Sequence, residues 1–156
     1  MEGKTVNHSS AVMLLPMTPQ DANLAGNVHG GVIMKRIDEV GAIVAVRHCQ
    51  TNVVTASVDR IDFIQPVFIG DVVTFKASIN LVGKTSMEVG VRVESENPIK
   101  GTIRHNASAF LTYVALDEER KPTEIPPLIL ETEEDIRRNR DARIRRETRL
   151  RTRSMP

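Results

Sequence analysis

The chain has 156 residues, a mass of 17.3 kDa and a formal net charge of +1, which fits one globular domain followed by a short tail. Its core must be aliphatic, because the sequence holds 18 Val and 13 Ile but only 4 Phe, 1 Tyr and no Trp. This composition disfavours the aromatic platforms on which single-stranded nucleic acid stacks. The one cysteine, Cys49, excludes an internal disulfide and a Cys-x-x-Cys zinc site, so a reducing cytoplasm fits best.

The first predicted strand covers residues 9–17 and leads into a loop at residues 18–23. Its apolar part, residues 11–17, is too short to span a bilayer and contains Pro16. No basic flank precedes it, as a secretory signal would require. We therefore expect a soluble chain without a membrane partner.

A long amphipathic helix is predicted from Gly30 to Val46. Apolar residues recur at helical spacing and form one buried stripe, made of Ile33, Ile37, Val40 and Val44. Asp38 falls between this stripe and the charged face, and its helical neighbours include the small residues Gly41 and Ala42. Small residues beside a carboxylate leave room for another group to approach. Geometry alone, however, favours the simpler interpretation that Asp38 is a boundary carboxylate that meets solvent or Lys35.

The sequence after the helix has the two-residue period of strands, rich in Val, Ile and Thr. The predicted strands are residues 53–64, 71–81, 86–94 and 102–116. Val82 to Thr85 form the turn of an antiparallel hairpin. One long apolar helix and five strands predict an α+β fold, in which an antiparallel five-stranded sheet wraps around the helix.

Residues 131–156 differ in kind from residues 1–130, because they carry 9 Arg against 6 Asp and Glu. Acidic residues come first and arginines follow, an order that complements the dipole of a helix. We interpret this extension, which follows Pro126-Pro127, as a charged, solvated helix beyond a domain at residues 1–130. The alternative is an arm that binds a partner chain or a polyanion.

One segment, from Asp21 to Gly41, resembles the signature of the hotdog-fold acyl-CoA thioesterases and is similar to the brain-type cytosolic acyl-CoA hydrolase family. It contains Asp-Ala-Asn, then His-Gly-Gly at residues 29–31, and Ile-Asp-Glu around Asp38. Three later segments also resemble that family, namely residues 54–59, 84–88 and 107–114. The likeness extends over roughly residues 10–130.

The resemblance implies a thioesterase that hydrolyses fatty acyl-CoA to a free fatty acid and coenzyme A, without a cofactor. It assigns catalysis to Asp38 and Asn23, with Asp38 as a general base or a nucleophile. Asn23 would position water or the carbonyl, although an asparagine in a loop usually serves the turn itself. Gly30 and Gly31 lie at the helix start, where backbone N–H groups and the dipole favour the developing oxyanion.

The resemblance also implies that each site is shared between two copies of the chain, with Asn23 of one copy facing Asp38 of the other. We therefore expect a homodimer, further assembled as three dimers, with neither nucleic acid nor membrane as a partner. Residues expected to bind coenzyme A are Ala56, Ser57, Val58, Lys84, Thr85, Ser86 and Met87. Read without the resemblance, these are ordinary strand and turn residues. A phosphate-binding P-loop is excluded at Gly83-Lys84-Thr85, because Ser78 stands where the first glycine must be.

Two other functions are compatible with a hotdog domain. A non-catalytic acyl-CoA sensor would not need Asp38 and would carry a recognisable DNA-binding unit. A dehydratase would need a histidine in its site, and His29 is the only candidate nearby. No metal site is expected, because His29, His48 and His105 are scattered along the sequence.

Overall fold

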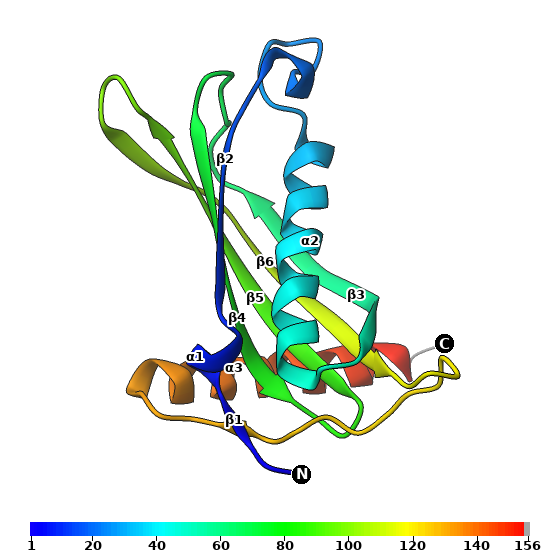
Figure 1. Cartoon of the computed structure of the whole chain (residues 1–156). Coiled ribbons are helices and arrows are strands. Elements are labelled where there is room, and N and C mark those ends of the chain that lie inside the picture. Colours follow the sequence, from blue (N-terminus) through cyan, green and yellow to red (C-terminus); the bar gives the residue numbers. More distant parts are fainter. Residues whose placement is uncertain (155–156) are drawn as a thin grey trace.

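The computed structural model describes residues 1–154 and contains a five-stranded sheet with a long helix on its concave face (Figure 1). The strands are β2 (Ala11–Pro16), β3 (Asn52–Phe63), β4 (Val72–Val82), β5 (Ser86–Asn97) and β6 (Thr102–Leu116). Their order across the sheet is β2-β4-β5-β6-β3, and all neighbouring pairs are antiparallel. The predicted strands are confirmed, and β2 and β3 form the two edges of the sheet.

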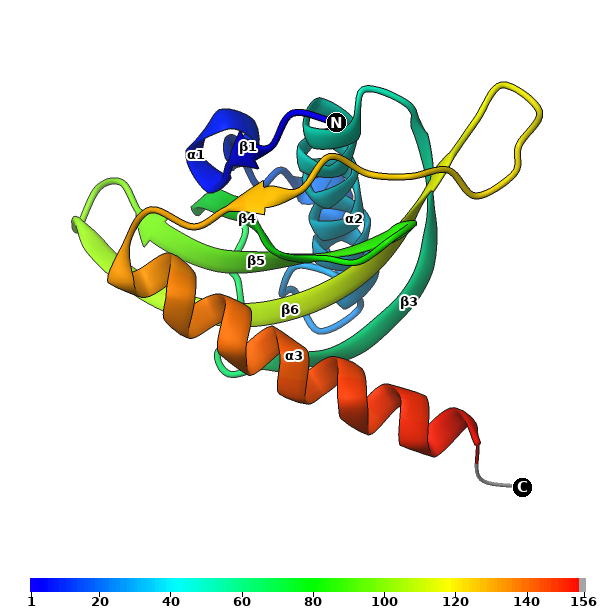
Figure 2. The ribbon, with the colours of Figure 1, turned by 90° about the horizontal axis from the view of Figure 1, so that it is seen from below.

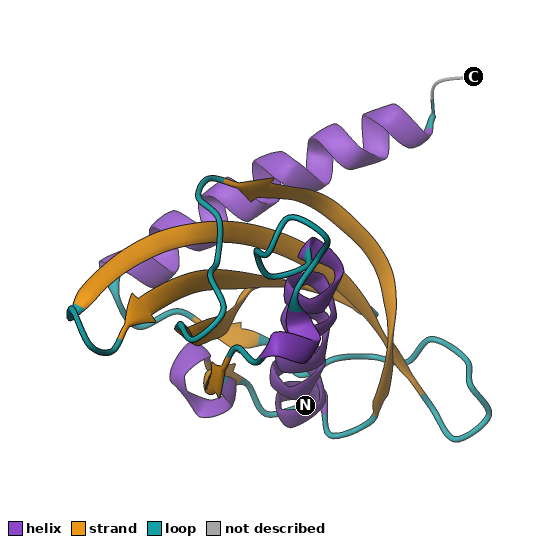
Figure 3. Ribbon diagram, turned by 90° about the horizontal axis from the view of Figure 1, so that it is seen from above, coloured by secondary structure: helices purple, strands orange, loops and turns teal. Residues whose placement is uncertain are grey.

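Helix α2 (Gly30–Cys49) crosses the concave face, and the sheet curls around it (Figure 3). The four residues of the predicted stripe are at most 2% exposed, and they share one core cluster with inward-facing strand residues such as Val73 and Phe75. Burying side chains of this size contributes about 1.5–3 kcal/mol each. The helix therefore holds the sheet in its curved form.

The sequence did not predict four short elements. They are β1 (Lys4–Thr5), α1 (Val6–Ser9), the 3₁₀ turn η1 (Pro19–Asp21) and β7 (Leu128–Ile129). Turn η1 lies beside the start of α2, where the His29 N–H donates a 2.7 Å hydrogen bond to the Asp21 carbonyl, whereas β1, α1 and β7 lie near its C-terminal end. Strand β1 pairs in parallel with β7. His48, at the end of α2, is fully buried, and its Nε2 lies 2.8 Å from the carbonyl oxygen of Pro126. Lys4 Nζ donates a 2.8 Å hydrogen bond to the carbonyl of His48.

The C-terminal helix α3 (Glu133–Arg153) corrects the interpretation of a solvated tail. It lies against the convex face of the sheet, opposite α2 (Figure 2). Ala142 is fully buried, and Asn139 Nδ2 donates a 2.9 Å hydrogen bond to the carbonyl of Asn80. Arg145 forms an ion pair at 2.7 Å with Glu88 of β5, whose side chain is only 2% exposed. Because such a buried charge is costly without its partner, the ion pair fixes α3 on the sheet.

From the sequence we expect a chain without a membrane partner, and the lengths and hydropathy of its helices bear on this. Within residues 1–154, none of them is both long and apolar enough to cross a bilayer.

The buried His48 predicts a pH-dependent stability. Burial lowers the pKa of His48, so the folded protein holds the neutral ring, whereas an unfolded chain takes up a proton near pH 6.5. Stability is therefore complete above about pH 6.5 and falls with further acidification, by up to about 1.4 kcal/mol per pH unit. Melting temperatures measured between pH 7.5 and 5.5 should fall less steeply for His48→Gln than for the parent chain. The control is His8→Gln, on an exposed residue whose charge is the smallest of the contributions to the lowered pKa of His48, so it should change the slope far less than His48→Gln does. Parallel curves for parent and His48→Gln would contradict the assignment.

Candidate active site

The carboxylate of Asp38 is held by one oxygen and open at the other. Its Oδ1 accepts hydrogen bonds from Thr55 Oγ1 at 2.8 Å and Tyr113 Oη at 3.0 Å. Within residues 1–154, Oδ2 has no hydrogen-bond or ion-pair partner, and Asp38 is half-buried. Lys35, considered as its neighbour on sequence grounds, forms no ion pair with it. The geometry thus gives Asp38 a fixed orientation and one oxygen available for chemistry.

Tyr113 reaches Asp38 from β6, through the core. Its side chain is fully buried, and Oη lies 3.0 Å from both the carbonyl oxygen and Oδ1 of Asp38. A Cβ on Gly41 would overlap Tyr113 Oη, so only glycine lets the ring approach α2 this closely. Burial, followed by the negative charge of Asp38, raises the pKa of Tyr113 far above its usual value. The hydroxyl therefore stays protonated and donates.

Sequence reasoning missed both donors to Asp38. The small residues beside Asp38 predicted that something approaches it, and in the structure this is the chain's only tyrosine. Thr55 lies within a segment that carried the family resemblance, yet nothing in the sequence indicated that its side chain points to Asp38.

The glycine pair begins α2 as predicted. His29 is the N-cap residue, and its Nδ1 accepts a 2.9 Å hydrogen bond from the Gly31 N–H. The Gly30 N–H donates no hydrogen bond within residues 1–154. Phe63 of β3 forms the nearest wall, since a Cβ on Gly30 would lie 3.8 Å from its ring. Asp38 lies eight residues further along α2, roughly 12 Å along the helix axis.

Asn23 lies in the loop before α2, and the structure does not bring it into contact with Asp38 of the same chain. Its Oδ1 accepts hydrogen bonds from the backbone N–H groups of Ala25 at 2.9 Å and Asn27 at 3.1 Å. This is the turn role that an asparagine commonly serves. The residue is exposed, and its side-chain NH₂ has no acceptor within the described part of the chain.

The residues expected to bind coenzyme A fall into two groups, on β3 and at the turn between β4 and β5. Ala56 and Val58 are exposed on the edge strand, whereas the Ser57 hydroxyl is buried without a partner. Register shifts on either side of this segment bend β3. At the turn, Lys84 is exposed, Thr85 and Ser86 are half-buried, and Met87 belongs to the core.

Several apolar side chains on α2, on β3 and its next residue, and in the loop before α2 are exposed, and together they are called the exposed apolar surface. They are 41–110% exposed, namely Leu24, Met34, Ile43, Val46, Val54, Val58, Phe63 and Ile64. The outer edge of β3 is also unpaired within residues 1–154. Single exposed apolar residues are common, but a cluster along an open strand edge indicates an interaction surface.

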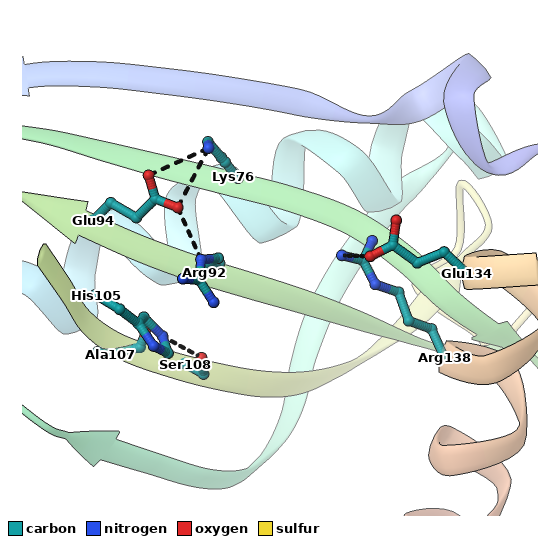
Figure 4. A network of polar contacts seen from close by, with 8 residues as sticks. All are labelled: Lys76, Arg92, Glu94, His105, Ala107, Ser108, Glu134 and Arg138. Carbon is teal, nitrogen blue, oxygen red and sulfur yellow. Dashed lines mark hydrogen bonds and ion pairs between the residues drawn. The ribbon is translucent and has the colours of Figure 1, made fainter. Parts of the chain in front are cut away.

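A cavity of about 410 Å³ lies on the other side of the sheet, between β4, β5, β6 and α3. None of the predicted catalytic or coenzyme-binding residues lines it. Three of the cations that line it pair with carboxylates outside its lining (Figure 4): Lys76 and Arg92 share Glu94, and Arg138 pairs with Glu134. His105 Nε2 lies 2.8 Å from the Ser108 hydroxyl. Among residues 1–154, no group of three His, Cys, Asp or Glu is arranged to hold a metal ion.

The sequence and the fold were each compared with known proteins, and both comparisons find the same class of protein. The chain is 42% identical over 139 residues to the cytosolic acyl coenzyme A thioester hydrolase of Rattus norvegicus, covering 88% of this chain and 36% of that protein. It therefore spans about a third of the length of that relative.

Solved structures match over nearly the whole chain. An apo-hexameric acyl-CoA thioesterase superposes with a TM-score of 0.96 and 35% identity over 100% of both chains. The acyl-CoA hydrolase of Staphylococcus aureus in complex with butyryl coenzyme A gives a TM-score of 0.90 and 34% identity, over 96% of this chain and 92% of that one. That hydrolase has also been solved with one aspartate, one asparagine or one threonine replaced by alanine. A family model described as the thioesterase superfamily matches residues 25–102, so the chain belongs to the thioesterase superfamily.

Proposed function

We propose that this protein is an acyl-CoA thioesterase of the cytoplasm, which hydrolyses the thioester of fatty acyl-CoA to a free fatty acid and coenzyme A. The observation that carries the proposal is the half-buried Asp38, fixed through one oxygen by Tyr113 and Thr55 and open at the other. The names of the rat and Staphylococcus aureus relatives support this substrate class. Residues 1–130 would form the catalytic domain and residues 131–156 its extension.

Thioester hydrolysis needs an attacking oxygen, and Asp38 can provide it in two ways. As a general base, its open oxygen takes a proton from water while that water attacks the thioester carbonyl. As a nucleophile, the same oxygen attacks the carbonyl to form an anhydride, which water then cleaves. In both routes the carbon–sulfur bond breaks and coenzyme A leaves as a thiol once the sulfur has gained a proton.

The oxyanion would be stabilised at the start of α2. The Gly30 N–H and the helix dipole favour negative charge there, and the missing side chains let a thioester approach. For Gly31, a substrate oxygen would compete with or displace the contact that its N–H makes with His29 Nδ1. This start lies roughly 12 Å along the axis from Asp38 of the same chain, whereas one reacting carbonyl must lie about 3 Å from both groups.

A second copy of the chain resolves this separation. In a two-fold symmetric dimer with antiparallel α2 helices, Asp38 of one copy comes near Gly30, Gly31 and Asn23 of the other. The exposed apolar surface and the unpaired edge of β3 are features that such a partner would cover. We further propose that three such dimers assemble, as the hexameric state of the superposed thioesterase suggests for the family.

Residue spacing supports the three polar residues assigned to this site. In the Staphylococcus aureus hydrolase, the substituted asparagine, aspartate and threonine are separated by 15 and 17 residues. Asn23, Asp38 and Thr55 have the same order and the same spacing. Thr55 therefore joins the proposed site, although the sequence alone did not point to it.

Replacing Asp38 by asparagine should remove the proton acceptor or nucleophile while keeping the side chain's size. We expect kcat for butyryl-CoA to fall at least about a hundredfold, which is typical for such a group, with the melting temperature little changed. Thiol release measures the rate. Glu39→Gln is the matched control, because Glu39 is the adjacent carboxylate on α2 and pairs with Arg36 on the surface. Near-normal turnover by Asp38→Asn, or an equal loss in both variants, would contradict the role of Asp38.

A shared site predicts complementation between two inactive variants. Asn23→Ala and Asp38→Asn chains should each be nearly inactive alone, but a heterodimer of the two contains one intact site. If random exchange gives half heterodimers, activity should return to roughly a quarter of the parent value, provided that the two sites of a dimer work independently. Mass spectrometry checks that exchange has occurred. A mixture that stays inactive after confirmed exchange would rule out catalysis by two independent sites shared across the dimer.

A further inference from the structure

The edge strand β3 contains two bulges, at each of which one residue has no partner on the neighbouring strand β6. Across the first bulge, Thr55 and Ser57 pair with consecutive residues of β6, so Ala56 is the extra residue. The second bulge has the same form, and its extra residue is Asp59. Two residue pairs join β3 to β6 between the bulges, so this segment is weakly held by its own sheet.

The first bulge decides which way the Thr55 side chain points. In a regular strand, residues two apart share one face of the sheet. The partners of Thr55 and Ser57 are consecutive on β6, so these two side chains point to opposite faces. Thr55 therefore faces α2 and donates its 2.8 Å hydrogen bond to Asp38, whereas Ser57 faces the convex side. A slip of the register by one residue would turn Thr55 away from Asp38.

Helix α3 holds the second bulge from the convex side of the sheet, where its second half reaches β3 (Figure 2). Arg149 Nη1 donates a 2.7 Å hydrogen bond to Asp59 Oδ2, and the two side chains are only 17% and 19% exposed. Within residues 1–154, neither side chain has a second ion-pair partner. Because the pair is partly buried, salt screens it less than an exposed pair. The ion pair therefore fixes the extra residue of the bulge.

A second arginine, one helical turn earlier, fixes the helix beside the same bulge. Arg145 donates hydrogen bonds of 2.7 and 3.1 Å to Glu88, and its guanidinium carbon lies 3.7 Å from the centre of the Phe110 ring. Phe110 pairs across the sheet with Arg60, the residue that follows the second bulge. Residues four apart lie on one face of a helix, so Arg145 and Arg149 reach the sheet side by side. Arg145 thus anchors the helix, and Arg149 contacts the bulge.

We propose that Arg149 is a positioning residue for thioester hydrolysis. By holding Asp59, it keeps the bulged segment of β3 in the register that directs Thr55 at Asp38. The inference rests on the proposed function, in which Thr55 helps to fix the catalytic carboxylate. Arg149 has no contact with Asp38 of its own chain, because it lies on the opposite face of the sheet from α2. The C-terminal helix thereby contributes to the geometry of a site that it does not enter.

A double-mutant cycle between Arg149 and Thr55 tests this role. Thr55→Val removes the hydroxyl that binds Asp38 and keeps the shape of the side chain, so kcat for butyryl-CoA should fall at least about tenfold. Arg149→Gln should lower kcat at least about fivefold, because a displaced Thr55 no longer orients the carboxylate. In the double variant, kcat should equal that of Thr55→Val within about twofold, since the contact is already absent.

Two further variants make the test specific. Arg151→Gln is the matched control, because Arg151 is exposed near the same end of α3 and forms no ion pair within residues 1–154. It should keep the parent kcat, and a loss equal to that of Arg149→Gln would overturn the role of Arg149. Asp59→Asn removes the same ion pair from the strand side and should reproduce the loss seen for Arg149→Gln. It carries the test if Arg149→Gln does not fold.

Hydrogen–deuterium exchange separates this inference from the proposed function, because it needs no activity. The peptide of residues 52–63 should exchange at least about fivefold faster in Arg149→Gln and Asp59→Asn than in the parent or Arg151→Gln. If the parent hydrolyses no acyl-CoA but shows this pattern, the thioesterase proposal fails and the role of Arg149 in holding β3 stands. An unchanged kcat in Arg149→Gln, kcat losses that multiply in the double variant, or unchanged exchange in β3 would overturn the inference.

Discussion

The contact between Tyr113 and Asp38 joins the core of the fold to its proposed chemistry, and the rest of the site is arranged around it. Tyr113 comes from β6, the strand next to the edge, and its ring lies in the same aliphatic core that holds α2. Because position 41 is glycine, the hydroxyl reaches both the backbone and the carboxylate of Asp38. The core thereby sets the orientation of the carboxylate, and within residues 1–154 the second oxygen is left without a hydrogen-bond partner.

That arrangement determines what the molecule needs from a partner. In a single chain, the oriented carboxylate of Asp38 lies in the middle of α2. The backbone amides at the start of α2 are the unpaired one of Gly30 and that of Gly31, which is bound to the N-cap residue. The carboxylate and these amides are too far apart to act on one carbonyl. The exposed apolar surface lies on α2, on β3 and its next residue, and in the loop before α2, alongside charged residues such as Lys35, and the outer edge of β3 is unpaired within residues 1–154. Two-fold pairing would bury this surface and bring the separated groups together in two equivalent sites. On the opposite face, α3 reinforces the sheet through the buried ion pair of Arg145 with Glu88.

Strong periodicity made most of the fold predictable, and contacts between distant residues explain what was missed. The stripe from Ile33 to Val44 specified the helix, and β-branched runs specified the four strands after it. Strands β1 and β7 have two residues each, so they exist only because their partners are brought together. The position of α3 on the sheet depends on its contacts with Glu88 and Asn80. In the sequence, nothing distinguishes these two residues from other polar residues of a strand. Likewise, Asp38 was predicted, whereas its donors Thr55 and Tyr113, 17 and 75 residues away, were not.

The kinetic constants of Tyr113→Phe test the central claim most directly, because this change removes only the hydroxyl that orients Asp38. The claim that the core positions the catalytic carboxylate predicts a kcat for butyryl-CoA at least about tenfold lower, the loss expected for a hydrogen bond to a charged group. It predicts that KM stays close to the parent value, because substrate is bound elsewhere. A kcat equal to that of the parent, in a variant shown by circular dichroism to be folded, would contradict the account.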